Sequence, residues 1–267
     1  LCGKGRVLVN AALTSTRMKI ITWNCNGGLR NKTAEADLLN ADILIIQECE
    51  SPEHSTPAYK EWAGEYLWVG SHKNKGIGIF PKNGNTVKAL NWSGTFKLTG
   101  LCSSSPTLTW KTAELNLFLP FSINNEFNVL AVWTKGKDSE SFRYIGQFWK
   151  YLQIHRSDLA RNKTLILGDL NSNKIWDNSD RWWNHSDVVA ELREIGVESL
   201  YHYSKGEAQG CETNPTFYLY RKLERPYHID YVFCSSDLLN SCELEIGSVE
   251  NWLKVSDHLP LSVKLNS

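Results

Sequence analysis

Short runs of apolar and β-branched residues, bounded by polar or turn-forming residues, recur along the chain. Runs of this kind have the length and composition of β-strands. They cover Lys19–Trp23, Ile43–Gln47, Gly76–Phe80, Glu114–Leu119, Asn128–Trp133, Thr164–Leu167, His228–Phe233 and Leu261–Leu265. The pattern therefore predicts strands distributed over most of the sequence.

Other segments have apolar residues at helical spacing. The clearest helix is predicted over Ser141–Ala160, where one stripe contains Phe142, Ile145, Phe148, Trp149, Leu152 and Leu159. Further helices are predicted over Ala34–Leu39 and Val188–Ile195. The second is followed by Gly196, a residue that commonly ends helices. Helices interleaved with strands predict a layered α/β fold.

Nothing in the pattern divides the chain into two domains. We find no internal repeat, low-complexity tract or long linker, so residues 18–267 are expected to form a single domain. The only methionine, Met18, directly precedes the first predicted strand. Residues 1–17 show no core pattern and are predicted to be an N-terminal appendage that precedes the natural start.

Composition narrows the class of protein. Hydrophobic residues make up 42% and charged residues 22% of the chain, as in folded soluble proteins. Lys and Arg number 29 and Asp and Glu also 29, so no overall charge directs the protein to a polyanion or a membrane. No window has the ~18 apolar residues of a membrane span. The seven cysteines are scattered without metal-site spacing, which predicts reduced thiols and a cytoplasmic location.

The strongest chemical signal is Thr164–Asn173, in which an apolar strand ends in Gly-Asp-Leu-Asn. Alternation along an extended chain would place Asp169 and Asn171 on one side, an anion beside an amide donor. This pair suits chemistry on a phosphate. The alternative is an ordinary turn, because Asp and Asn both favour turns.

Other strand ends carry similar residues. Asn24 and Asn26 follow the first strand, Glu48 follows the second, and Asp257-His258 precede the last. Asp230 lies within an apolar and aromatic strand, where a lone carboxylate needs a partner. Each has a structural alternative, such as a turn for the asparagines or a satisfied core position for His258. Their order and number favour one shared site.

The set resembles the endonuclease/exonuclease/phosphatase superfamily, and most closely its exonuclease III and AP endonuclease branch. The matching motifs are Trp23-Asn24-Cys25-Asn26-Gly27, Gln47-Glu48, Gly168-Asp169-Leu170-Asn171, Ile229-Asp230-Tyr231 and Ser256-Asp257-His258-Leu259-Pro260. The resemblance implies a four-layered α/β sandwich of the deoxyribonuclease I kind, with two central mixed sheets flanked by helices. It also implies a divalent-metal site at one end.

The residue chemistry fits phosphodiester hydrolysis. Asp169 would deprotonate the attacking water, and Asn171 would contact the phosphoryl group or fix the nucleophile. His258, held by Asp230, would donate to the phosphoryl oxygens as a cation. Glu48 is the expected ligand of Mg²⁺, with Mn²⁺ as a possible substitute. The remaining residues assigned to the catalytic and metal site are Asn24, Asn26 and Asp257.

Two positions depart from the family. Trp133 stands where many members have Tyr or His, and His228 stands where repair nucleases usually have Arg; both are predicted to lie near the substrate phosphate. The loop that follows Asn173 adds further candidate substrate contacts at Arg181, Trp182, Trp183, Asn184 and His185. Its aromatic residues could stack on bases, or they could form a small core beneath the loop.

The sequence thus predicts a Mg²⁺-dependent phosphodiesterase, a DNA nuclease before other classes, that acts as a monomer without a protein partner or a membrane. A small-molecule or lipid-headgroup phosphoesterase is the alternative within the same superfamily. A binding module without catalysis is a remote alternative, because no central acid is missing.

Overall fold

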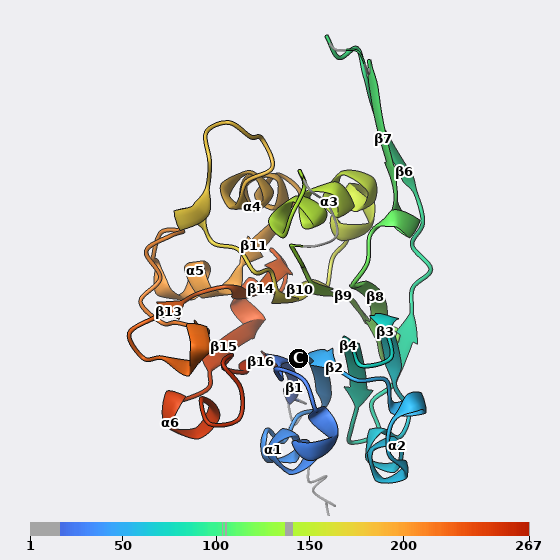
Figure 1. Cartoon of the computed structure of the whole chain (residues 1–267), viewed down its shortest axis with the longest axis vertical. Coiled ribbons are helices and arrows are strands. Elements are labelled where there is room, and N and C mark those ends of the chain that lie inside the picture. The colour runs from blue at the N-terminus through green and yellow to red at the C-terminus, as the bar shows by residue number, and fades with distance from the viewer. Residues whose placement is uncertain (1–16, 103, 105, 137–140, 267) are drawn as a thin grey trace, which may run out of the picture.

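Two six-stranded mixed sheets lie face to face, and helices cover their outer faces (Figure 1). The computed structural model describes residues 17–102, 104, 106–136 and 141–266. In the first sheet the strand order is β15 (Cys242–Ile246), β16 (Leu261–Asn266), β1 (Arg17–Asn24), β2 (Ile43–Cys49), β4 (Lys75–Pro81) and β3 (Leu67–His72). Strands β1 and β2 are parallel, whereas β16 runs antiparallel to β1.

The second sheet has the same mixed character. Its strand order is β11 (Val197–Ser199), β14 (Asp230–Ser235), β10 (Thr164–Asp169), β9 (Phe127–Trp133), β8 (Phe118–Ile123) and β5 (Val87–Ala89). Strands β9 and β10 are parallel, and β14 runs antiparallel to β10 with Asp230 opposite Asp169. The register thus places two carboxylates at the same end of the sheet.

The helices form the two outer layers. Beside the first sheet lie α1 (Thr33–Leu38), α2 (Pro57–Ala63) and α6 (Val249–Trp252); beside the second lie α3 (Ile145–Leu159) and α4 (His185–Glu194) (Figure 1). Helix α5 (Leu200–Lys205) contacts β14 and β15, one strand of each sheet. Two hairpins complete the fold, β12 (Phe217–Tyr218) with β13 (Pro226–Tyr227), and β6 (Thr95–Thr99) with β7 (Thr107–Lys111). The β6–β7 hairpin projects away from the body (Figure 1).

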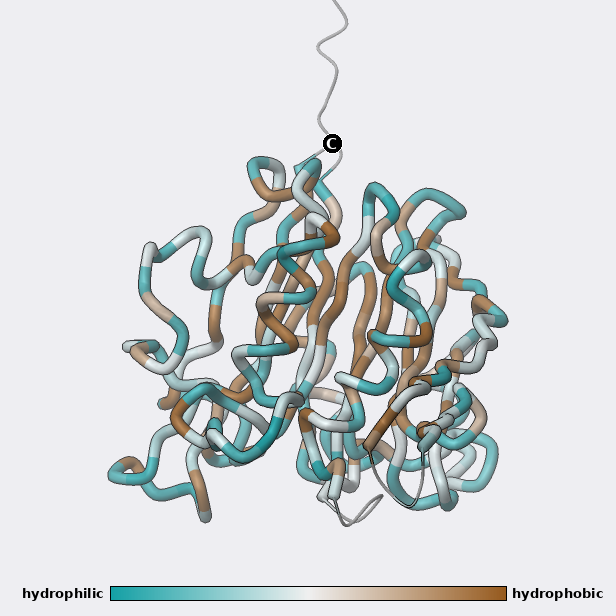
Figure 2. Tube along the Cα trace, turned by 90° about the horizontal axis from the view of Figure 1, so that it is seen from above, coloured by the Kyte–Doolittle hydropathy of each residue, from teal (hydrophilic) through white to brown (hydrophobic). Residues whose placement is uncertain are grey.

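Alternation along the central strands explains the layering. In β10, Leu165 and Leu167 pack into the core between the sheets, while Ile166 packs against α3 and α4. In β2, Ile45 faces the core between the sheets and Ile46 faces the helices of the first sheet. Both faces of these strands are buried, so each has a run of successive apolar residues, and hydrophobic residues concentrate along the strands (Figure 2).

Most predicted strands are confirmed, and two are corrected. The prediction over Glu114–Leu119 is largely wrong, because Thr112–Glu114 form a turn of 3₁₀ helix and the strand covers Phe118–Ile123. There the Glu114 carboxylate accepts a hydrogen bond from the Lys111 N–H at 3.1 Å, which ends the preceding strand. The strand predicted from His228 begins at Asp230.

The three predicted helices exist with shifted ends. Helix α3 begins at Ile145 instead of Ser141, because Tyr144 has a φ of 50°, outside the helical region. Helix α4 begins at His185, three residues before the prediction, because Asn184 and Asp187 form a capping box there. Apolar spacing located the buried stripes, but the backbone conformation of Tyr144 decided where α3 starts and capping decided where α4 starts.

The chain end also differs from the prediction. Strand β1 begins at Arg17, within the predicted appendage, and Arg17 pairs with Asn266 and Glu243. Residues 1–16 lie outside the described residues. None of the helices formed by the described residues is long and apolar enough to cross a membrane. The six cysteines in the described part of the chain form no disulfide.

Candidate active site

Four strand ends bring together the polar residues that the sequence separates. Asn24 ends β1, Asp169 ends β10, Asp230 begins β14, and His258 precedes β16. All four are at most 5% exposed. The Asn24 Nδ2 atom donates to Asp169 Oδ2 at 2.9 Å, a hydrogen bond that joins the two sheets. The interface between the sheets therefore ends in a buried polar cluster.

Asp169 has no exposed surface and accepts several hydrogen bonds. Its Oδ1 atom accepts from the Asn171 N–H at 2.8 Å, and its Oδ2 atom accepts from the side-chain amides of Asn24 and Asn171. Burial raises the pKa of Asp169, the His258 imidazolium opposes that effect, and the Asp230 charge adds to it; the result is a pKa of about 7. A carboxyl group with this pKa can take a proton at neutral pH.

His258 faces both carboxylates. Its Nδ1 atom lies 2.9 Å from Asp230 Oδ2, and its Nε2 atom lies 3.9 Å from Asp169 Oδ2. Burial would lower the pKa of His258, but the charges of Asp230 and Asp169 outweigh burial and raise the pKa to about 9. The ring is therefore an imidazolium at neutral pH, with its Nε2–H directed into the site.

Asn171 reaches Asp169 through a turn and not through strand alternation. Strand β10 ends at Asp169, and Asn171 has a φ of 44°, which folds its side chain back so that Nδ2 lies 2.8 Å from Asp169 Oδ2. The turn depends on Gly168, whose φ is 145° and where a Cβ atom would lie 1.9 Å from the Val132 carbonyl oxygen. Asp169 and Asn171 are therefore close together as predicted, but a turn and not strand alternation brings them together.

Glu48 lies beside this cluster on a β-bulge. The register of β2 against β4 shifts between Gln47 and Cys49, and Glu48 has a φ of 62°. A bulge redirects a side chain out of the strand's alternation. One carboxylate oxygen lies 3.5 Å from Asn24 Nδ2, and the other forms an ion pair with Lys75. A partly exposed carboxylate that already attracts a cation fits a divalent metal with oxygen ligands.

The other predicted metal ligands lie on flanking loops. Asn26 is exposed, and its N–H donates to Asn24 Oδ1 at 3.0 Å. Asp257 is half-buried, and its carbonyl accepts from the Tyr218 N–H. Among the described residues, the one close group of acids and histidines consists of Asp169, Asp230 and His258. Because the His258 ring is protonated and paired with Asp230, this group is better suited to proton transfer than to metal binding.

A cavity of about 510 Å³ adjoins Asn171. Tyr144, Trp176, Phe217 and Tyr227 line it together with the cations of Arg143 and Arg181. Trp176 and Tyr227 lie 5.2 Å apart between ring centroids. The cavity therefore combines flat aromatic surfaces with two cations and the carboxylate of Asp177, beside the buried polar cluster.

The tryptophans among the predicted substrate contacts pack against other side chains of the protein. Trp133 is buried in the core between the sheets, with the Lys135 ammonium 3.8 Å from its ring centroid. Trp183 packs on Phe142 at 4.3 Å between centroids, and Trp182 packs on Trp149 at 4.9 Å while remaining half-exposed. These contacts match the small core that the sequence left as an alternative for the Trp-rich loop.

Asn184 and His185 line the cavity. The side chain of Asn184 is hydrogen-bonded within the protein, whereas the buried Nδ1 atom of His185 has no hydrogen-bond partner among the described residues. Both Nδ2 hydrogens of Asn184 are directed at backbone carbonyls, of Asn178 and of Arg181. His185 is buried, which lowers its pKa to about 4, and its Nε2 atom bonds the Gln209 side chain. A neutral, buried histidine is a poor partner for a phosphate.

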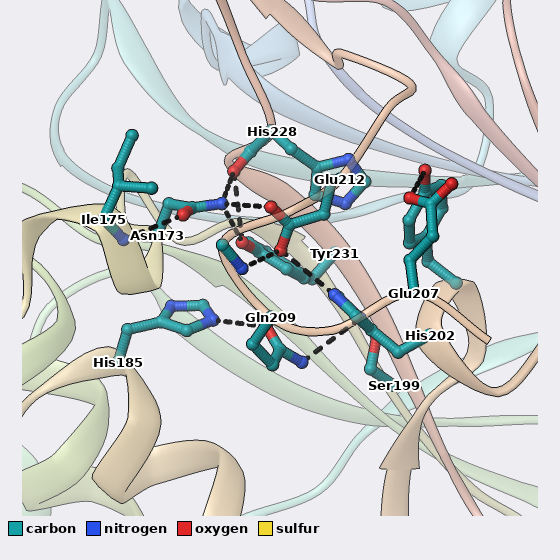
Figure 3. Close-up of polar contacts among 12 residues, drawn as sticks. Asn173, Ile175, His185, Ser199, His202, Glu207, Gln209, Glu212, His228 and Tyr231 are labelled. Atoms are coloured by element: carbon teal, nitrogen blue, oxygen red, sulfur yellow. Dashed lines mark hydrogen bonds and ion pairs between the residues drawn. The ribbon is translucent and has the colours of Figure 1, made fainter. Parts of the chain in front are cut away.

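His228 belongs to a buried polar network behind the site (Figure 3). The network is centred on Asn173, whose Nδ2 atom faces the His228 carbonyl at 2.9 Å, Glu212 at 3.0 Å and the Tyr231 hydroxyl at 3.1 Å. The His228 ring turns away, its Nδ1 atom donates to the Asn214 carbonyl, and burial lowers its pKa. The network fastens the loop after β10 to the residues before Asp230.

Several positioning residues escaped the sequence analysis. The Thr216 hydroxyl accepts the N–H groups of Ile229 and Asp230, both at 3.0 Å. The Ser256 hydroxyl donates to the Asn24 carbonyl at 2.7 Å and accepts the His258 N–H at 3.1 Å. Ser256 lies inside a recognised motif and could have been found there, whereas Thr216 lies in a loop that carries no pattern.

A family model matches most of the chain. The model described as the Endonuclease/Exonuclease/phosphatase family matches residues 21–258, from β1 through His258. The chain belongs to this family. Membership makes it a hydrolase of phosphoester bonds and confirms the resemblance drawn from the motifs. No curated protein sequence matches the chain.

Solved structures confirm the family fold. The 3′ phosphatase NExo from Neisseria, bound to a product DNA hairpin, has a TM-score of 0.66 at 18% identity and matches 94% of this chain and 100% of its own. An AP endonuclease from Archaeoglobus fulgidus has a TM-score of 0.62 at 20% identity, with the same coverage. TDP2 from D. rerio, complexed with a single-strand DNA product, has a TM-score of 0.54 at 16% identity, again with that coverage. The predicted four-layered α/β sandwich is therefore correct.

Proposed function

We propose that the protein is a Mg²⁺-dependent phosphodiesterase that cleaves DNA. The observation that carries this proposal is the buried cluster in which Asp169 has a pKa of about 7 and lies 3.9 Å from a protonated His258. A base and a cationic donor side by side match the needs of phosphodiester hydrolysis, in which a water is deprotonated while negative charge on the phosphoryl oxygens is stabilised.

Asp169 is the general base of this proposal. Asn24 and Asn171 hold its Oδ2 atom through their side-chain amides, and the Asn171 N–H holds Oδ1. Because Asn171 Nδ2 also donates to the Thr134 carbonyl at 3.0 Å, both of its hydrogens are committed. Asn171 therefore fits the role of orienting the base, which the sequence left open beside direct contact with the phosphoryl group.

His258 is the electrostatic partner of the phosphoryl oxygens. Asp230 accepts the Nδ1–H and favours the charged ring, so Nε2–H remains available to an oxygen of the substrate. Thr216 and Ser256 fix the backbone of Asp230 and His258, and the ring therefore enters the reaction already oriented.

Glu48 would hold the Mg²⁺ ion, for which Mn²⁺ could substitute. When bound, the metal supplies positive charge to the phosphoryl oxygens and the leaving group. The bulge directs Glu48 towards Asn24, next to the catalytic cluster. Asn26 and Asp257 remain proposed contacts of the metal or of its water shell, because Mg²⁺ keeps several waters in sites with one or two carboxylates.

The cavity favours DNA as the substrate. Trp176, Phe217 and Tyr227 offer flat surfaces to a nucleobase or a sugar, and Arg143 and Arg181 offer charge to neighbouring phosphates. The solved NExo and TDP2 structures of the same fold contain DNA products. A smaller phosphoester is the second candidate, because a cavity of about 510 Å³ is the size of many small-molecule sites.

Product analysis with Mg²⁺ tests both candidates. The substrates would be plasmid, single-stranded and abasic-site DNA, together with small phosphomonoesters and phosphodiesters. We expect cleavage of at least one DNA substrate, which Asp169→Asn and metal chelation abolish. Hydrolysis of small esters alone would select the second candidate, and no hydrolysis of any phosphoester would contradict the proposal.

A further inference from the structure

Glu48 and Glu50 are neighbours with opposite environments. Glu50 is buried, and its carboxylate accepts the N–H groups of Leu29 and Arg30 and pairs with the Arg30 guanidinium at 3.0 Å. These donors hold Glu50 in the fold. Glu48 has the Asn24 amide at 3.5 Å and, as its charged partner, the ammonium of Lys75.

Lys75 is brought to Glu48 by the β3–β4 hairpin. The hairpin turns at Lys73 and Asn74, and Lys75 is the first residue of β4. The side chain passes close to Gly27, where an added Cβ atom would lie 3.7 Å from Lys75 Cε. The Lys75 side chain is 43% exposed and that of Glu48 is 19% exposed, so the ammonium reaches the carboxylate from the solvent side. This is the direction from which a hydrated ion must also arrive.

We infer that Lys75 exchanges with the metal at Glu48 and thereby sets the affinity of the site for a divalent cation. The ammonium neutralises Glu48 in the metal-free protein and is released when the metal binds. A lysine suits this role because its ammonium is a point charge on a long, rotatable stem, unlike the planar and pre-organised guanidinium that holds Glu50. The inference rests on the proposed metal site at Glu48.

Competition and structural support predict opposite effects on metal affinity when Lys75 is removed. A lysine that only supported the shape of the site would weaken metal binding when removed. A lysine that competes for the carboxylate strengthens metal binding when removed, because the metal then displaces no ion pair and meets no neighbouring positive charge. Lys75→Met keeps most of the stem's apolar contact and removes the charge.

The test measures Mn²⁺ binding by electron paramagnetic resonance in the parent protein, Lys75→Met, Lys73→Met and Glu48→Gln. Lys73 is an exposed lysine in the same hairpin and serves as the matched control. We expect Lys75→Met to bind Mn²⁺ about three- to tenfold more tightly than the parent. Lys73→Met should match the parent, and Glu48→Gln should bind poorly.

A second measurement follows the release of the Lys75 ammonium from Glu48. Amine-specific acetylation, located by mass spectrometry, should modify Lys75 faster when Mg²⁺ is added, while Lys73 reacts at an unchanged rate. Mn²⁺ binding by Lys75→Met that is equal to or weaker than that of the parent would overturn the inference. An acetylation rate of Lys75 that does not change when Mg²⁺ is added would also overturn it. In both cases a loss of binding in Glu48→Gln would leave the proposed metal site standing. A Glu48→Gln protein that binds Mn²⁺ like the parent, or a parent that binds none, would overturn the metal site and the inference together.

Discussion

Asp169 shows how the surroundings of one side chain change its pKa. The sequence places an ordinary carboxyl group at the end of a strand, and such groups are ionised well below neutral pH. Complete burial raises its pKa, and the His258 charge limits that rise, so the group remains able to lose its proton near pH 7. The chemistry of Asp169 therefore depends on residues that are distant from it in the chain.

Asp169→Asn should remove catalysis and keep the fold. The amide has the same shape but cannot accept a proton, so we expect kcat to fall by about 10²- to 10⁴-fold. Asp237→Asn is the control, because Asp237 caps the Lys163 N–H at the opposite end of β10 and should not affect kcat. Steady-state kinetics and circular dichroism check both statements, and an active Asp169→Asn enzyme would remove Asp169 from the mechanism.

The rate should depend on pH through Asp169 and His258 together. Activity requires an ionised Asp169 and a protonated His258, so kcat/KM should rise through about pH 7 and fall through about pH 9. Because the two groups interact, the apparent pKa values of both limbs describe the pair and not the single residues.

Asp230→Asn tests whether His258 causes the alkaline limb of this pH profile. The change removes the nearer negative charge and lowers the pKa of His258, so the alkaline limb should move below about pH 8. Profiles recorded at saturating Mg²⁺ check this shift, and an alkaline limb that stays in place would exclude His258 as its origin.

At the scale of elements, two local distortions redirect side chains at the site. The bulge at Glu48 interrupts β2, and the turn at Asn171 follows immediately after β10. Both residues have positive φ values, which are unusual for side chains other than glycine. Distortion at the ends of rigid strands gives two side chains directions that regular alternation forbids.

The Trp-rich loop should separate into a structural and a binding part. Trp183→Ala should lower the free energy of unfolding by about 2–4 kcal/mol, because Trp183 packs on Phe142 and on Gly146 of α3. Trp176→Ala should leave stability unchanged, because Trp176 is half-exposed at the cavity, and should weaken DNA binding by about 1–3 kcal/mol. Denaturation curves and binding titrations distinguish the two, and the reverse pattern would refute this division.

At the scale of the whole molecule, a neutral chain can still bind a polyanion locally. Positive and negative residues balance overall, yet Arg143 and Arg181 both line the cavity beside the buried polar cluster. Any attraction for DNA must then come from a few contacts near the site and not from a global field.

DNA binding should therefore weaken with salt in a measurable way. With the inactive Asp169→Asn protein, a plot of log affinity against log salt should have a slope of about −0.9 for each phosphate neutralised on duplex DNA. Arg181→Met should reduce the magnitude of the slope by about one. Lys88→Met, on the edge strand β5, should not change it. A slope near zero would contradict DNA as the substrate and favour a small phosphoester.

The sequence by itself determined the layers of the fold and the identity of the central residues. Runs of apolar residues located β1, β2, β9, β10 and β16, because strands buried on both faces have apolar residues in succession. Ordered motifs located Asn24, Asp169, Asp230 and His258, which the structure brings into one cluster. Such predictions succeed where a local pattern has one physical cause.

Only the tertiary structure decided which of the other candidates are buried among protein side chains and which are exposed. The sequence predicted His185, His228 and Trp133 as substrate contacts, but their side chains are buried within the protein. Lys75 and Thr216 carried no signal, because their roles depend on a bulge and on a loop that meets distant strand ends. Direction, burial and pKa depend on long-range contacts, and a linear pattern of residue types does not contain those contacts.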